Sequence, residues 1–166
     1  MKKFSFLMLS LAVVTLFPRA GITAGPVDAD GNASVVIVNQ VGIESVQDMD
    51  FGTLISPGYN GTFTLSTSGT LSCASQWICT GTPAVGKFIV SANNASVNVT
   101  YQDGTLSDGA GHTLALAVTG DNTVTLTNGT GELKVGATLS TAWDTPAGTY
   151  STANTGGQPY KVTVNY

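Results

Sequence analysis

Apolar and polar residues alternate with a period of two along most of this chain. The last eight residues show the pattern without interruption, with Tyr160, Val162, Val164 and Tyr166 on one face and polar side chains on the other. Such alternation is typical of a strand that buries one face. No segment shows a convincing helical period, so the pattern predicts an all-β protein.

Similar segments recur between clusters of Gly, Asn, Asp and Pro, which favour turns. Roughly nine short strands, with a turn about every 8–12 residues, are the spacing of a single-domain β-sandwich. The Asn93–Asn94 pair predicts a hairpin turn. The predicted strands cover residues 33–43, 49–55, 62–69, 86–93, 96–102, 112–120, 122–129, 131–139, 147–153 and 159–166.

The first predicted strand differs from the others because it is apolar on both faces. Val35, Ile37 and Val41 lie on one face, and Val36 and Val38 on the other. A strand of this kind needs burial on both sides. It is either the first strand of its own domain or an arm that inserts into another molecule, and the sequence leaves both interpretations open.

The N-terminal segment has the pattern of a secretory signal. Lys2 and Lys3 precede an apolar run, and small residues follow up to Ala24, where we expect cleavage. The run is too short to span a membrane. Removing residues 1–24 from the 166 leaves 142. That length suits one domain, which covers residues 42–166 if the segment 25–41 is an arm.

The charge after residue 24 is strongly negative. Three basic residues, Lys87, Lys134 and Lys161, stand against ten acidic ones, which gives a net charge of −7. This balance disfavours nucleic acid and anionic membranes as partners. The abundance of Thr, Ser, Gly and Asn is typical of an exported β protein, so we expect the chain on the cell surface or outside the cell, with the periplasm as its route.

The two cysteines predict a local disulfide between Cys73 and Cys79, the usual state of a cysteine pair in an exported protein. A metal site is the disfavoured alternative. The cysteine spacing does not match a zinc site, and His112 is the only histidine.

The chain shows no pattern of catalytic residues. His112 lies in a Gly-rich turn, where solvent exposure is expected. Asp103 and Asp108 flank a loop, and Asp48 and Asp50 flank a methionine; we interpret all four as turn caps. The sequence therefore predicts a protein that is not an enzyme and needs no metal or cofactor.

Three aromatic residues are candidates for binding. Trp77 lies inside the disulfide loop, where its ring would stack on a sugar or plug one end of the sandwich; we favour the plug. We expect Trp143 to anchor a turn or the core. A self-contained, carbohydrate-binding sandwich that uses Trp77, Tyr59 and Trp143 remains the alternative function.

Two elements of the sequence resemble a known family. DFGT at 50–53, and AGTYS at 147–151 followed by VTVNY at 162–166, are similar to a family of secreted bacterial proteins of unassigned function with a pilin-like fold. More broadly, the chain resembles chaperone–usher fimbrial subunits. The chain departs from that pattern in three places: the penultimate residue is Asn165, residues 152–159 form an insertion, and the disulfide spans a shorter segment.

The resemblance implies an immunoglobulin-like, pilin-like sandwich of about 7–9 strands that lacks its last strand. Residues 25–41 would be the donor strand, with Val35, Ile37 and Val41 as plugs. The strand 159–166 would border the acceptor groove and bind a periplasmic chaperone. The expected function is a structural subunit of a surface fimbria or pilus that supports adhesion or biofilm formation. Its expected partners are other copies or related subunits, a chaperone, an outer-membrane usher and a surface glycan.

Overall fold

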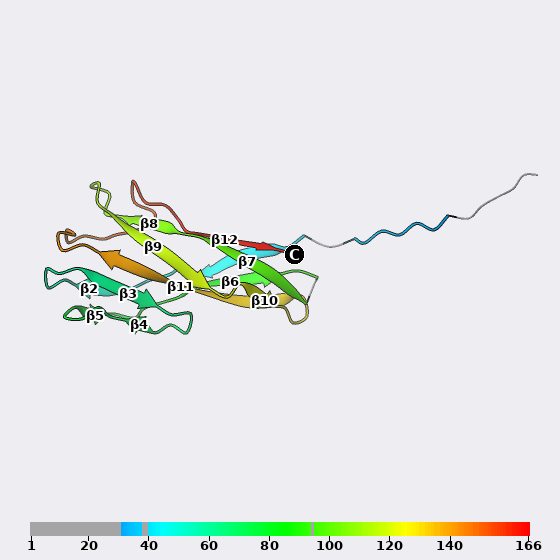
Figure 1. The fold of residues 1–166 in the computed structure, drawn as a ribbon, viewed down its shortest axis with the longest axis horizontal. Coiled ribbons are helices and arrows are strands. Elements are labelled where there is room, and N and C mark those ends of the chain that lie inside the picture. The colour runs from blue at the N-terminus through cyan, green and yellow to red at the C-terminus, as the bar shows by residue number, and fades with distance from the viewer. Residues whose placement is uncertain (1–30, 38–39, 94) are drawn as a thin grey trace, which may run out of the picture. The chain divides into compact units, whose positions relative to one another are not determined.

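The computed structural model describes residues 31–37, 40–93 and 95–166 (Figure 1). The chain divides into two compact units, residues 1–36 and Ile37–Tyr166. In the first unit, residues 31–36 are exposed and have no regular secondary structure. The predicted signal segment 1–24 and the start of the arm lie outside the described residues.

The described part of the second unit is an all-β sandwich, as the alternation predicts. It contains no helix with the length and hydropathy required to cross a membrane. Its twelve strands are β1 (Gly42–Gln47), β2 (Thr53–Ile55), β3 (Gly61–Leu65), β4 (Leu71–Ser72), β5 (Ile78–Thr80), β6 (Gly86–Ser91), β7 (Ser96–Gln102), β8 (Gly104–Ser107), β9 (Thr113–Gly120), β10 (Thr123–Thr125), β11 (Thr130–Thr141) and β12 (Lys161–Asn165).

The long strand β11 organises the larger sheet (Figure 1). Its first half pairs with β6, its second half pairs with β3, and β9 pairs along its other side. β1 extends this sheet beyond β6, β4 extends it beyond β3, and β8 extends it beyond β9. The smaller sheets are β10–β7–β12 and β2–β5, and all pairings are antiparallel.

The core lies where the inward faces of these strands meet. In β11 every second residue is buried. At Gly136 the backbone of β11 approaches β3 so closely that a side chain there would collide with the carbonyl oxygen of Leu65. Phe63 and Leu65 on β3 are fully buried. The inward faces predicted for the segments 112–120 and 131–139 are confirmed, because their apolar residues belong to this core.

Several predicted strands are wrong in their bounds: in 49–55 only Thr53–Ile55 forms a strand, and 33–43 and 147–153 differ most. The described residues of 33–41 lie in no strand, and β1 begins only at Gly42. β6 ends at Ser91, which pairs with Gly42, so residues before Gly42 have no β6 backbone left to pair with. The segment 147–153 is irregular apart from a single bridge at Ser151, because the preceding Pro-Ala-Gly sequence turns the chain.

Candidate functional site

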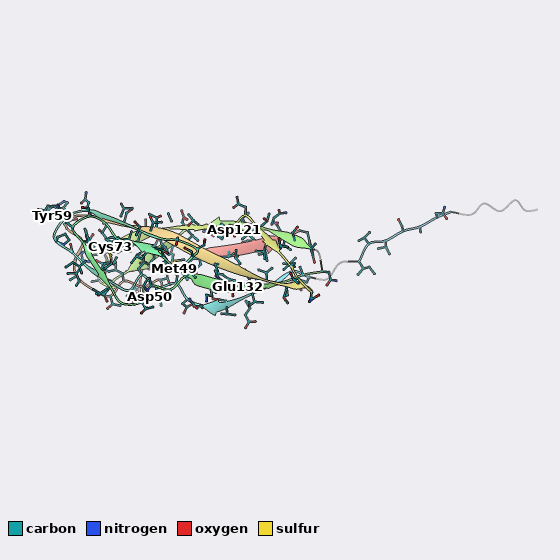
Figure 2. All side chains as sticks on the ribbon, turned by 90° about the horizontal axis from the view of Figure 1, so that it is seen from below. Met49, Asp50, Tyr59, Cys73, Asp121 and Glu132 are labelled. Carbon is teal, nitrogen blue, oxygen red and sulfur yellow. A yellow bond between two sulfur atoms is a disulfide. The ribbon has the colours of Figure 1, made fainter. Side chains whose placement is uncertain are left out.

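A groove of about 1250 Å³ opens on one side of the sandwich. One wall is the segment 48–56, which follows β1, and the other is the segment 145–153, which precedes β12. Figure 2 places Met49 and Asp50 of the first wall on the sandwich. Inward-facing leucines line the groove between the walls: Leu106, Leu114, Leu116 and Leu139.

Several apolar groups at the groove are incompletely covered. Leu106, Tyr150 and Tyr160 pack against the core but stay half-buried. Trp77 also lines the groove, and its buried indole N–H has no hydrogen-bond partner among the described residues. A buried donor without an acceptor costs about 1–3 kcal/mol. The groove therefore offers an occupant apolar contacts, whereas the indole N–H of Trp77 is enclosed by the sandwich itself.

Two edge strands adjoin this groove: β1 ends just before Asp48 and β12 begins just after Tyr160, and both of these residues line it. Among the described residues, β1 pairs with β6 alone and β12 pairs with β7 alone. Tyr160, directly before β12, contacts Phe88 of β6 edge to face at 6.2 Å. Burial, and secondly the Asp48 carboxylate directly after β1, raise the pKa of Tyr160. Each edge thus has a backbone side without a ladder partner.

The C-terminal strand confirms the predicted alternation. Val162 and Val164 face the core and are half-buried, whereas Lys161, Thr163 and Asn165 are exposed. Tyr160 also packs against the core, but Tyr166 remains 43% exposed. The inward face of β12 is therefore formed but not fully covered.

The insertion at 152–159 covers a different edge. Thr105 of β8 exchanges two backbone hydrogen bonds with Gln158, and Ser107 exchanges two with Ser151. The hydroxyl of Ser107 also donates to the carbonyl of Thr155, at 2.7 Å. These contacts occupy the outer side of β8, so the edge of β8 is covered. The edge of β12 remains available.

The candidate plugs of the arm do not behave alike. Val35, Val36 and Ile37 are 81%, 87% and 85% exposed, whereas Val41 is half-buried against the core of the sandwich. Covering consecutive apolar side chains that are exposed to this degree is favourable, because it lowers the free energy. The sequence pattern gives the arm two apolar faces, and in the described segment 31–37 the apolar side chains of both faces are exposed.

The disulfide prediction is confirmed: Cys73 and Cys79 are bonded, with their Cα atoms 6.1 Å apart. Trp77, within that loop, packs edge to face on Phe63 with ring centroids 4.9 Å apart. This is the predicted plug at one end of the sandwich. The core role expected for Trp143 is wrong, because its side chain is 71% exposed, although the residue lies in a turn.

Of the carboxylates that the sequence marks as turn caps, Asp50 and Asp108 have that role, whereas Asp103 binds the backbone of β9 instead. Asp50 Oδ1 accepts from the backbone N–H of Gly52 at 2.8 Å, and Asp103 Oδ1 accepts from that of Val118 at 2.8 Å. Asp48 is exposed, next to the groove wall. In the described ranges no group of three or more His, Cys, Asp or Glu side chains is arranged to hold a metal.

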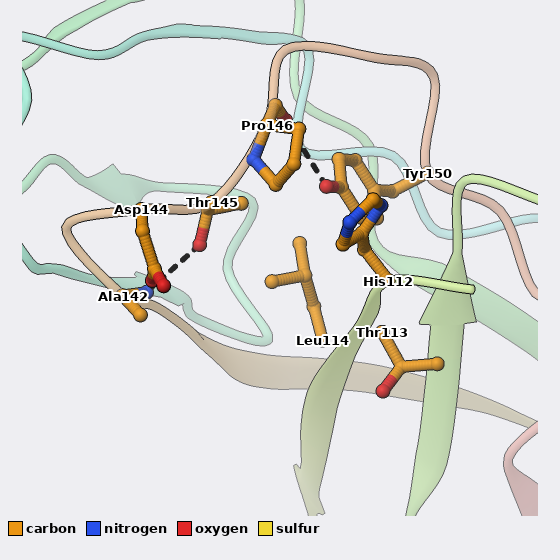
Figure 3. A pocket seen from close by; sticks show the side chains of 8 residues that line it. All are labelled: His112, Thr113, Leu114, Ala142, Asp144, Thr145, Pro146 and Tyr150. Atoms are coloured by element: carbon orange, nitrogen blue, oxygen red, sulfur yellow. Dashed lines mark hydrogen bonds between the residues drawn. The ribbon is translucent and has the colours of Figure 1, made fainter. Parts of the chain in front are cut away.

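A polar cluster forms beside the groove around the single histidine (Figure 3). His112 Nδ1 lies 2.6 Å from Asp108 Oδ2, and Asp108 Oδ1 accepts from the backbone N–H groups of Ala110 and His112. The hydrogen bond from His112 is the main cause that lowers the pKa of Asp108. The Tyr150 hydroxyl donates to the Pro146 carbonyl at 3.0 Å. This cluster ties the β8–β9 turn to the second groove wall.

Sequence analysis missed the central part of the groove. Leu106 belongs to β8, a strand that was not predicted because the Asp103–Gly104 pair resembles a turn. Met49 and Phe51 were assigned to a strand, but they form an irregular wall. An apolar residue between turn residues, such as Leu106 after Gly104, is the only signal in the sequence that marks this position.

Comparison with known proteins gives one assignment. Residues 41–166 match the family described as a domain of unknown function (DUF4402), and the chain belongs to that family. No curated protein and no solved structure is similar enough to match.

Proposed function

We propose that this member of the DUF4402 family is a non-enzymatic structural subunit of a bacterial surface fibre, assembled by strand donation. The arm 25–41 of one copy would complete the sandwich of another. The observation that carries the proposal is the leucine-lined groove between the wall after β1 and the wall before β12, next to two strands that each have a single partner among the described residues.

The energetics of the groove favour a β-strand as its occupant. An added strand supplies N–H and C=O groups to an open edge and carries alternate side chains into pockets. Each large apolar side chain that becomes fully buried contributes about 1.5–3 kcal/mol.

The arm has the composition that such an occupant requires. Val35 and Ile37 lie on one face of the chain, with Val36 on the other, and all three are exposed. Its 17 residues, if extended, span at most about 56 Å, which is ample for a short sandwich. Donation from each copy to the next is a head-to-tail contact, so it generates an open fibre rather than a closed ring.

The route of export completes the proposal. The secretory signal would place the chain in the periplasm, where a chaperone would bind the edge of β12 until an usher at the outer membrane exchanges it for the arm of the next subunit. The assembled fibre would support adhesion to a surface or the formation of a biofilm.

The test places a charge on the arm without touching the sandwich. Ile37→Asp is expected to abolish heat-sensitive polymer ladders on a gel after mild detergent, and to leave the thermal unfolding of the monomer unchanged. Ser34→Asp, also exposed but on the opposite face of the arm, is the matched control and should retain ladders. Ladders from Ile37→Asp, or from a chain lacking 25–41, would refute strand donation.

The alternative function is a monomeric carbohydrate-binding module. Two exposed aromatic residues favour it, Trp143 and Tyr59, which are 71% and 60% exposed. Trp77 is less suited, because its ring packs on Phe63. A mature protein that elutes as a monomer, binds glycans on an array and loses that binding in Trp143→Ala would favour this alternative.

A further inference from the structure

We infer that one end of the sandwich, an end patch formed by Ile55, Tyr59, Ile78 and Trp143, is the seat for the sandwich of the neighbouring copy in the fibre. This inference rests on the proposed strand donation and adds to it the direction in which the arm enters and the contact that fixes one subunit on the next.

The end patch is an apolar surface built by elements that meet at that end. Ile55 of β2 and Ile78 of β5 are directly paired across the two-stranded sheet, and both are about half exposed. Tyr59 lies just before Gly61 and Trp143 just after Thr141, and Gly61 and Thr141 are paired. Figure 2 shows Tyr59 at one tip of the sandwich, with Cys73 close behind.

Exposed large apolar side chains gathered at one end of a domain mark an interaction surface. The pair Ile55 and Ile78 could have been polar without loss to the core, since Leu54 and Cys79 supply the inward contacts of these strands. A threonine at either outward position would therefore serve the fold of the monomer as well as the isoleucine does.

The opposite end of the sandwich, where the arm joins it, carries polar residues beside the partly exposed Ile43 and Tyr166. Gly42 pairs with Ser91, and the last ladder pair of β12 joins Asn165 to Asn98. Exposed Ala95 precedes β7 at the same end, where its carbonyl accepts from Leu126.

Chain length forces neighbouring sandwiches into contact. Ile37, the last exposed plug, is five residues from Gly42, where β1 begins, and five extended residues span at most about 17 Å. An arm seated in a groove therefore brings its own sandwich to one mouth of that groove.

The end patch indicates at which mouth of the groove the neighbouring sandwich lies. Ile55 and Trp143 line the groove and also belong to the end patch, so apolar surface continues from the groove onto that end. An arm that leaves the groove there sets the arm-bearing end of its own sandwich on the patch. The arm then runs antiparallel to β12, in which Lys161 lies toward the patch end and Asn165 toward the opposite end.

The test is cross-linking between copies in assembled polymers of the full mature chain. Copies with Tyr59→Cys are mixed with copies with Ala95→Cys, and a short bismaleimide is added; the native disulfide leaves no other free thiol. A dimer joined through positions 59 and 95 is expected. A dimer joined through two copies of position 95 would indicate entry from the other mouth and would overturn the inference, as would polymers that cross-link at neither pair.

A matched pair of substitutions tests the patch itself. Ile78→Ser, at a patch residue that does not line the groove, is expected to cause loss of most of the 59–95 product, while arm-dependent ladders persist. Ile89→Ser removes an equally large, partly exposed side chain from the outer face of β6 and should leave the product unchanged. Undiminished cross-linking in Ile78→Ser would refute the patch, whereas absence of ladders from the unsubstituted chain would refute strand donation itself.

Discussion

Two sides of the sandwich are built from the same kind of sequence and differ in how well they are covered. On the side of β3 and β11, Phe63, Leu65 and Val135 are completely buried. On the side of β1 and β12, the residues with the same inward position are not: Ile43 is 37% exposed, and Val162 is only half-buried. β12 alternates in sequence as regularly as β3 and β11, whereas β1, with Ile43 and Val46 three residues apart, does not.

The difference shows that alternation determines which face of a strand is apolar but not whether anything covers it. β11 has strands on both of its sides, so its inward residues are enclosed. β1 and β12 each have one strand neighbour among the described residues. The open side therefore has apolar residues but fewer strand neighbours than the closed side.

The largest effect is expected on the closed side. Phe63→Ala should lower the free energy of unfolding by about 3–5 kcal/mol, because it removes a fully buried ring and leaves a cavity under Trp77. Urea unfolding followed by circular dichroism measures the change. A loss below about 1 kcal/mol would mean that this side is no better packed than the other.

The disulfide should have a smaller effect. The double substitution Cys73→Ala and Cys79→Ala releases a loop with a sequence separation of six and should cost about 2 kcal/mol of stability on the chain-entropy model. The same unfolding assay, with and without reductant, compares the bonded and open loops. The bond also holds Trp77 on Phe63. We expect reductant to affect only the unsubstituted chain, because only that chain has a disulfide to reduce.

On the open side the cost should depend on an added strand. Val162→Ala is expected to lower the stability of the isolated chain by about 1 kcal/mol, because the side chain is only half-buried. Adding a peptide of residues 25–41 should stabilise the unsubstituted chain more than the variant. Equal stabilisation of both, measured as a shift in melting temperature, would place the peptide away from β12.

The smallest effect concerns the polar cluster beside the groove. The pKa of Asp108 is lowered in the folded chain, so the unfolded chain takes up this proton first as the pH falls below about 4. The contribution of Asp108 to stability is therefore present at neutral pH and is lost in acid, as the pH passes through its folded pKa. Unfolding of Asp108→Asn should differ from that of the unsubstituted chain at about pH 6, and the difference should vanish at about pH 2. A difference that persists in acid would mean that the carboxylate charge is not its cause.

Much of the fold follows from local sequence. The alternating residues of β7, β9, β11 and β12 predict their inward faces, and the spacing of Cys73 and Cys79 predicts their bond. The groove was less predictable, since Leu106 lies on a short strand between turn residues and contacts made by segments far apart in the chain form both walls. Trp143 was misjudged because an aromatic residue next to a turn has the same local sequence whether it is buried or exposed.

The sequence by itself determined that this protein is all-β, which residues face inward, and that its first apolar segment has two apolar faces, because side-chain direction in a strand is a local property with a period of two. Only the tertiary structure decided which edges stay open. It showed that the insertion covers β8 and leaves β12 uncovered, and it gathered Ile55, Tyr59, Ile78 and Trp143 at one end. The reason is physical: backbone pairing and burial depend on what lies across the sheet, and residues close in sequence do not specify that neighbour.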